Sequence, residues 1–269
     1  MQIQFRPFWA LIFGLALVLT LLIFPACKGG KAPLAGSVPP KIYISAAEHN
    51  YEKAIIAFEK MEQDSPSTKG GIVFTGSSSI RKWETLVEDM APLPVINRGF
   101  GGSIIRQVSF YANRFLIPLA PQLIVFYCGE NDICNDLSSH TDPLRNFKDF
   151  TAIIRYYLPQ THILYLSMKP SPLRWQYWEK FSKGNELIRA YTETDEKLRY
   201  LDVGEIMIGE DGRPKTHIWV SDSLHMNEAG YADWTNIVRP VVRSMWENVR
   251  QQPVNKEKRM QGKRRNIAE

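Results

Sequence analysis

The chain has 269 residues, is 44% hydrophobic and carries a formal net charge of +5. A chain of this length can bury a full core, and we expect one domain of about 200 residues once the two ends are set aside. The basic C-terminal end accounts for most of the charge, so the charge is no argument for a nucleic-acid-binding fold. Zinc-finger spacings, RNA-binding aromatic motifs and basic heptads are absent from the sequence.

The N-terminal end has the pattern of an export signal. Phe8 to Phe24 is an uncharged apolar run preceded by the single cation Arg6, whereas a buried core helix would show a polar face. Cys27 follows in Pro25-Ala26-Cys27, and the whole looks like a bacterial lipoprotein signal with Cys27 as the lipidated residue. An uncleaved anchor and ordinary secretion are the alternatives. We therefore interpret residues 1–27 as a signal peptide or membrane anchor, which places the rest of the chain in the cell envelope, outside the cytoplasm.

The next boundaries follow from composition. Residues 28–45 are rich in Gly, Pro, Ala and Ser, which is typical of a flexible linker. Residues 46–250 form the predicted domain. Residues 251–269 carry six Lys or Arg and almost nothing apolar, which predicts a basic disordered tail. Attraction of this tail to an anionic membrane surface or polymer is the alternative.

The predicted domain alternates between strands and helices. Short apolar runs typical of strands lie at 72–75, 95–97, 123–128, 163–167 and 200–203. Helix-length segments lie at 49–63, 80–90, 104–116, 144–158, 179–194 and 227–249, the last with Asn227 as a plausible N-cap. This order predicts a mainly parallel five-stranded sheet with helices on both faces. The run 123–127 is continuously apolar, as a central strand buried on both faces should be.

Chemistry-bearing residues follow the strands. Gly76-Ser77-Ser78-Ser79 follows the first strand, Asn97-Arg98-Gly99-Phe100-Gly101-Gly102 the second, and Gly129-Glu130-Asn131-Asp132 the third. Asp222-Ser223-Leu224-His225 precedes the last helix. Each stretch alone is a weak signal. Because ligands bind at the carboxyl ends of parallel strands, we expect all four stretches to meet at one edge of the sheet.

These four stretches resemble the blocks of the SGNH (GDSL-like) hydrolase superfamily of lipases and esterases, over about residues 70–243. The resemblance implies a three-layer α/β/α, flavodoxin-like fold and ester hydrolysis without a cofactor. Gly-Asp-Ser of the family falls on Gly76, Ser77 and Ser78, so it implies Ser78 as the nucleophile. The family's Asp, which is not part of the triad, is replaced by Ser77.

The resemblance assigns the remaining roles. Asp222 and His225 would complete the triad, and His225 suits proton transfer because an imidazole titrates near neutral pH. The backbone N–H groups of Ser78 and Gly102 and the side-chain amide of Asn131 would form the oxyanion hole. No metal and no cofactor are implied.

Each of these residues also has a structural interpretation. Ser78 could be a helix N-cap, Gly102 and Asn131 turn residues, Asp222 a cap and His225 a core histidine. The acidic and histidine residues after the third strand have no metal-ligand spacing, which favours solvated side chains over a metal site; they are Asp132, Asp136, His140 and Asp142.

Two further features have no assigned role. Cys128 and Cys134 could form a disulfide outside the cytoplasm, but two separate thiols are favoured, with Cys128 buried at a strand end. The aromatic segment Trp175–Trp178 could be a lid or a sugar or acyl platform, or could pack against the sheet.

The sequence therefore predicts a serine esterase that forms an acyl-enzyme and acts on a lipid or acylated carbohydrate of the cell envelope. Its partners would be the ester substrate and, through the N-terminal anchor, the membrane, but not nucleic acid. The alternative is a catalytically silent envelope carbohydrate-binding protein on the same fold. A flavodoxin-like nucleotide binder is disfavoured, because no phosphate-binding glycine motif lies at a strand–helix junction. The acyl chain, the alcohol and the oligomeric state are not readable from the sequence.

Overall fold

The computed structural model describes residues 38–45, 49–134 and 137–265, with side chains as far as residue 251. The apolar run 8–24, Cys27 and most of the predicted linker lie outside the described residues. Among the helices that are described, none has the length and apolar character needed to cross a membrane.

The sheet has five strands in the order β2-β1-β3-β4-β5, and every pair of neighbours is parallel. The strands are β1 (Ile72–Gly76), β2 (Val95–Gly99), β3 (Leu123–Tyr127), β4 (His162–Leu166) and β5 (Leu198–Leu201). The predicted mainly parallel sheet is confirmed, and each strand lies within two residues of its expected position.

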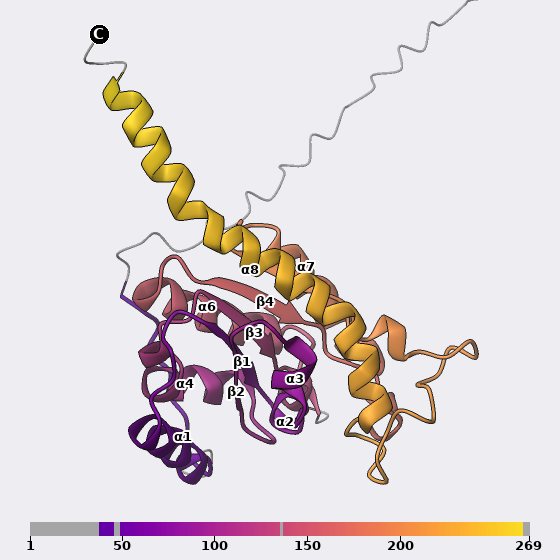
Figure 1. Cartoon of the computed structure of the whole chain (residues 1–269). Coiled ribbons are helices and arrows are strands. Elements are labelled where there is room, and N and C mark those ends of the chain that lie inside the picture. The colour runs from indigo at the N-terminus through magenta and orange to yellow at the C-terminus, as the bar shows by residue number, and fades with distance from the viewer. Residues whose placement is uncertain (1–37, 46–48, 135–136, 266–269) are drawn as a thin grey trace, which may run out of the picture. The chain divides into compact units, whose positions relative to one another are not determined.

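Helices cover both faces of the sheet (Figure 1). α3 and α8 pack on one face, where their side chains join Phe74 and Val125 in a common core. α1, α4, α6 and α7 pack on the other face around Phe126. Their bounds are α1 (Glu52–Asp64), α2 (Ser78–Arg81), α3 (Leu86–Met90), α4 (Ile105–Phe115), α5 (Glu130–Ile133), α6 (Asp142–Tyr157), α7 (Trp178–Thr192) and α8 (Glu228–Arg265). This is the three-layer α/β/α arrangement that the sequence predicted.

The central strand β3 contributes side chains to the hydrophobic cores on both faces of the sheet. Leu123, Val125 and Tyr127 belong to the core under α8, and Ile124 and Phe126 to the core under α4 and α6. All five residues are buried. A strand buried on both faces needs apolar side chains at every position, which is what the run supplies.

The strand register determines where the active-site loops begin. Gly76 at the end of β1 pairs with Gly99 at the end of β2 and with Tyr127 at the end of β3. These three strands therefore end at the same level. The loops that carry Ser78 and Asn131 start beside each other as a result.

The helix expected over 80–90 is divided into α2 and α3. The Asn97 side-chain amide donates to the backbone oxygens of Ile80 and Trp83, at 2.6 and 3.4 Å. Both carbonyls also accept a backbone N–H from three residues further on, so the Asn97 side chain stabilises a pair of turns in place of a continuous helix, and the buried Trp83 ring packs in the core. A tertiary contact thus overrides the local helical pattern.

The last helix agrees with the prediction at its start and differs at its end. Asn227 accepts a hydrogen bond from the Gly230 N–H at 3.2 Å, as an N-cap does. α8 continues to Arg265, so residues 251–265 are helical where we expected a disordered tail. The Gln, Lys, Glu, Met and Arg residues there are good helix formers, although Pro253 removes one helical hydrogen bond.

Candidate active site

The turn after β1 presents Ser78 at the edge of the sheet. Gly76 has φ 125°, and a Cβ there would lie 1.9 Å from the Tyr127 carbonyl oxygen, so the position requires glycine. The Ser77 N–H donates to that same oxygen at 2.8 Å. The chain then turns directly into α2, whose first residue is Ser78. Ser77, and not Ser78, is the N-cap residue, and its side chain makes no capping hydrogen bond.

The loop before α8 brings an imidazole to this serine. His225 Nε2 lies 2.9 Å from Ser78 Oγ, and His225 Nδ1 lies 2.5 Å from Asp222 Oδ2. With the Nδ1 proton directed to Asp222, Nε2 is the acceptor for the serine hydroxyl. The three side chains form one continuous chain of hydrogen bonds.

Hydrogen bonds to the Asp222 carboxylate keep it ionised. Its Oδ1 accepts the backbone N–H groups of Leu224 and His225 at 2.9 and 2.8 Å. Partial burial raises the pKa of Asp222, but the hydrogen bonds from the His225 ring and from these two N–H groups outweigh it and hold the pKa well below its usual range. An ionised carboxylate at this position can stabilise an imidazolium at His225.

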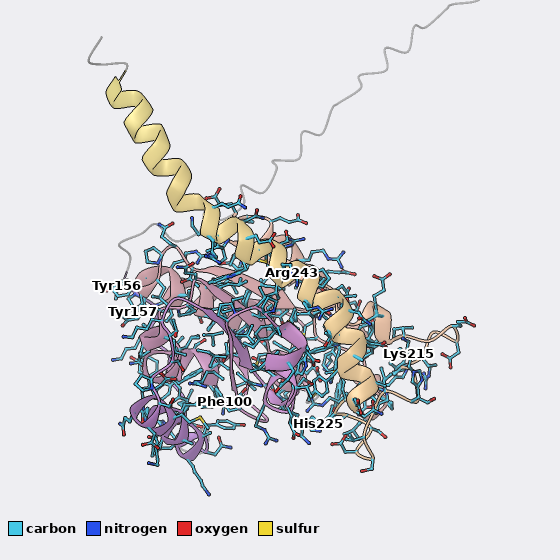
Figure 2. The ribbon with its side chains drawn as sticks, viewed as in Figure 1. Phe100, Tyr156, Tyr157, Lys215, His225 and Arg243 are labelled. Carbon is cyan, nitrogen blue, oxygen red and sulfur yellow. The ribbon has the colours of Figure 1, made fainter. Side chains whose placement is uncertain are left out.

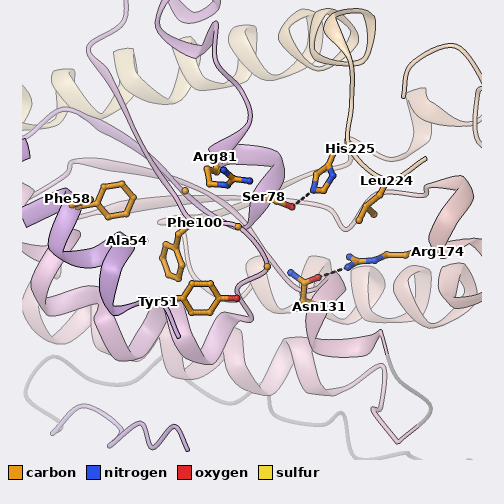
Figure 3. A pocket seen from close by; sticks show the side chains of 14 residues that line it. Tyr51, Ala54, Phe58, Ser78, Arg81, Phe100, Asn131, Arg174, Leu224 and His225 are labelled. Carbon is orange, nitrogen blue, oxygen red and sulfur yellow. Dashed lines mark hydrogen bonds between the residues drawn. The ribbon is translucent and has the colours of Figure 1, made fainter. Parts of the chain in front are cut away.

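A cavity of about 510 Å³ opens beside Ser78 and His225. Gly102 and Asn131 line the same cavity, and α1 supplies its opposite wall (Figure 3). The lining residues are Tyr51, Ala54, Ala57, Phe58, Ser78, Arg81, Gly99, Phe100, Gly101, Gly102, Asn131, Arg174, Leu224 and His225. In Figure 2, Phe100 and His225 lie at the same end of the domain, away from Tyr156 and Arg243.

The Asn131 amide has a fixed orientation. Its Nδ2 donates to Ser77 Oγ and to the Ser103 carbonyl oxygen, each at 2.9 Å. Its Oδ1 accepts Arg174 Nη2 at 2.7 Å. The nitrogen therefore faces the nucleophile turn, which is the orientation that a donor to an oxyanion needs.

The structure thus brings together all five residues expected at the site. Ser78, Gly102, Asn131 and His225 line one cavity, and Asp222 contacts His225 from behind. His225 is no core histidine, because both ring nitrogens bind residues of the site. The order of these residues in sequence and their convergence at one sheet edge agree with the blocks described above.

A family model described as "GDSL-like Lipase/Acylhydrolase family" matches residues 64–232. The chain belongs to this family. It is an ester hydrolase, and the matched region contains Ser78, Gly102, Asn131, Asp222 and His225, whereas the α1 wall of the cavity precedes it. No curated protein matches the chain in sequence.

Solved structures share the fold of this family member. A protein from Streptococcus pneumonia has a TM-score of 0.63 and 21% identity, over 71% of this chain and 91% of its own. A GDSL-like lipase from Bacteroides thetaiotaomicron has a TM-score of 0.60 and 19% identity, over 74% and 99%. An acetyl-xylooligosaccharide esterase from Geobacillus has a TM-score of 0.51 and 12% identity, over 63% and 93%.

Arg174 is a site residue that no sequence motif indicated. Arg174 lies in the 3-10 segment Pro172–Tyr177 after β4, and it donates to Asn131 and, at 3.0 Å, to Glu130 Oε2. The only available signal was that a cation follows a strand at the edge where the other blocks lie. Its contact with Asn131 spans 43 residues of sequence, which no local pattern reports.

Glu130 is the buried anion that holds Arg174 in place. It also accepts the Tyr127 hydroxyl and lies 3.4 Å from Lys169 Nζ. The Lys169 side chain is 1% exposed, and burial lowers its pKa, while the Glu130 carboxylate acts in the opposite sense. The carboxylate thus joins β3, the segment after β4 and the Asn131 turn.

Asp132 is buried and not solvated as we expected. It accepts the Ile105 N–H at 3.2 Å and the Asn146 amide at 2.8 Å, which ties α5 to the starts of α4 and α6. Burial raises the pKa of Asp132 to about 7. Within the described residues no cluster of histidine, cysteine and acidic side chains could hold a metal ion.

The cysteine and tryptophan residues near the site do not line the cavity, although the Cys128 thiol donates to the Ser103 carbonyl oxygen that also accepts Asn131. Cys128 and Cys134 are both free thiols, and Cys128 is buried, as the sequence favoured. Trp175 and Trp178 stack on each other with ring centroids 6.0 Å apart, and Arg213 lies over Trp175. Neither tryptophan lines the cavity beside Ser78. Arg174, directly before the aromatic segment, is the residue of this region that lines the cavity.

Arg174 is expected to affect hydrolysis through Asn131. Arg174→Gln should lower kcat about tenfold with little change in KM, because the amide loses the donor that fixes its orientation. Asn131→Ala should lower kcat about a hundredfold or more. The double variant should be no slower than Asn131→Ala alone, since both changes remove one function.

Arg213→Gln is the matched control, because this arginine stacks on Trp175 away from the cavity. It should leave kcat within about twofold of wild type. Losses that multiply in the double variant would show that Arg174 acts independently of Asn131. Thermal midpoints of all four variants separate these effects from unfolding.

Proposed function

We propose that this enzyme is a serine esterase that forms an acyl-enzyme at Ser78. The observation that carries the proposal is the unbroken hydrogen-bond chain from Ser78 through His225 to Asp222 at the mouth of the cavity. His225 Nε2 takes the hydroxyl proton as Ser78 Oγ attacks the ester carbonyl carbon. Asp222 stabilises the imidazolium that forms.

The developing oxyanion then needs donors already in position. The Ser78 and Gly102 N–H groups and Asn131 Nδ2 would supply them. In the resting geometry one Asn131 N–H points to Ser77 Oγ, so the oxyanion would replace that hydroxyl as the acceptor. Ser77, standing where the family has Asp, would thus keep the amide oriented between turnovers.

The reaction closes with balanced proton transfers. His225 returns its proton to the leaving alcohol as the tetrahedral intermediate collapses to the acyl-enzyme. A water molecule then gives a proton to His225 and attacks the acyl carbon, and Ser78 regains its proton when the acid leaves. Because each of these groups is present and connected, a catalytically silent binding protein is disfavoured.

We propose as substrate a lipid ester or an acylated carbohydrate of the cell envelope. The apolar wall that α1 and Phe100 give the cavity suits an acyl chain or the face of a sugar ring. Among the solved structures with this fold are an acetyl-xylooligosaccharide esterase and a family 3 carbohydrate esterase, which support the carbohydrate option.

Hydrolysis of 4-nitrophenyl esters from acetate to palmitate tests the activity and the acyl class. The wild-type enzyme should turn over part of the series, with an optimum at acetate for a sugar deacetylase and at long chains for a lipase. Ser78→Ala should lower kcat by about four to six orders of magnitude. Ser79→Ala should stay within about threefold, because its hydroxyl is buried away from His225. Full activity in Ser78→Ala would remove the proposal.

The location of the enzyme is a separate proposal. It is supported by the apolar run 8–24 and by Cys27 directly after it. The domain would lie outside the cytoplasm, tethered by a lipid on Cys27 or by the uncleaved segment. Metabolic labelling with palmitate should mark the wild-type protein and not Cys27→Ala. Recovery of the full-length protein in the soluble cytoplasmic fraction would contradict the export interpretation.

A further inference from the structure

The cavity beside Ser78 has an unbalanced charge. Its charged lining residues are Arg81 and Arg174, apart from the His225 imidazole, and none of its lining residues is Asp or Glu. Arg174 forms an ion pair with Glu130 at 3.0 Å. Within the described residues, the guanidinium of Arg81 forms no hydrogen bond or ion pair, and only its backbone N–H is engaged, by the Ser77 carbonyl oxygen. One uncompensated guanidinium therefore faces the space in which the ester would bind.

Arg81 lies close to the reacting groups. It is the last residue of α2, one helical turn after Ser78, so the two side chains lie on the same face of that helix. Figure 3 shows its guanidinium directed along the cavity toward Ser78, above Phe100. A group bound there would be part of the same substrate molecule that Ser78 attacks.

The loop after β2 is shaped around this arginine. A Cβ at Gly99 would lie 2.5 Å from the Arg81 backbone nitrogen, and a Cβ at Gly101 would lie 2.8 Å from Arg81 Nε. Side chains at these two positions would displace the arginine, and glycine at both lets it rest against the loop. Gly101 is adjacent to Gly102, so the guanidinium is held next to the proposed oxyanion hole.

Arg81 is exposed, but the cavity walls beside it are apolar. Phe58, Phe100 and Ala54 form an apolar wall of the same cavity, and apolar walls strengthen the field of a charge at the cavity mouth. A guanidinium is planar and offers paired N–H donors that match the two oxygens of a carboxylate or phosphate.

We propose that Arg81 is a specificity-determining residue that binds a negatively charged oxygen group, a carboxylate or phosphate, carried by the ester substrate. The preferred substrate is thus an anionic ester, with the charge within a few bonds of the ester carbonyl. This inference rests on the proposed esterase function and adds the charge of the substrate to it.

Esters that differ in one anionic group test the inference. For the acyl side, mono-4-nitrophenyl glutarate is compared with its neutral methyl ester. For the alcohol side, 4-acetoxybenzoate and 4-acetoxyphenyl phosphate are each compared with methyl 4-acetoxybenzoate. The measured quantity is the ratio of kcat/KM for the anionic ester to that for the neutral ester. Comparing this ratio between variants cancels both leaving-group reactivity and the fraction of folded enzyme.

In Arg81→Gln the ratio should fall about tenfold or more on at least one side, and in Arg81→Glu it should fall further. The side and the group that respond identify the anion. Lys82→Gln removes the neighbouring charge outside the cavity and is the matched control, with a ratio within about twofold of wild type. Added salt should lower the wild-type ratio.

A ratio that Arg81→Gln leaves within twofold on both sides overturns the inference while the esterase function stands. An equal fall in Lys82→Gln would also overturn it, because the preference would then reflect net charge. Failure of wild-type enzyme to hydrolyse any neutral or anionic ester would instead remove the proposed function, and this inference with it.

Discussion

The hydrogen bond between Ser78 Oγ and His225 Nε2 joins residues 147 positions apart, and the proposed chemistry depends on it. It forms because two independent parts of the fold end at the same place. β1, β2 and β3 end at the same level of the sheet, and the turn after β1 carries Ser78. The loop before α8 carries His225. The hydrophobic cores on both faces of the sheet fix the positions of these two loops relative to each other. The 2.9 Å contact between Ser78 Oγ and His225 Nε2 depends on that packing.

Much of this arrangement could be predicted from the sequence because its signals are local. A fully apolar run such as 123–127 indicates a central parallel strand, and parallel strands bring the following loops to one edge. Once the family blocks are aligned, Ser78, Gly102, Asn131, Asp222 and His225 need no further information to be placed together. Asn227 as an N-cap is local in the same sense.

The remaining features depend on contacts between distant residues. Arg174 gains a role only because Glu130 and Asn131 lie beside it in the fold. Asp132 is buried because α4 and α6 close over it, although its sequence surroundings are polar. The break between α2 and α3 requires the Asn97 amide from a neighbouring strand. In the sequence, Arg81 has no feature that distinguishes it from other surface arginines. Its place in the cavity depends on the loop with Gly99 and Gly101, which packs against it only in the folded chain.

We propose that His225 activates Ser78 and not the serines on either side of it. Peptide mass spectrometry after reaction with a fluorophosphonate measures this directly, because the probe phosphonylates the activated hydroxyl. We expect a single adduct on Ser78 in the wild-type protein and strongly slowed labelling in His225→Ala. An adduct on Ser77 or Ser79, or labelling that is unaffected by loss of His225, would contradict it.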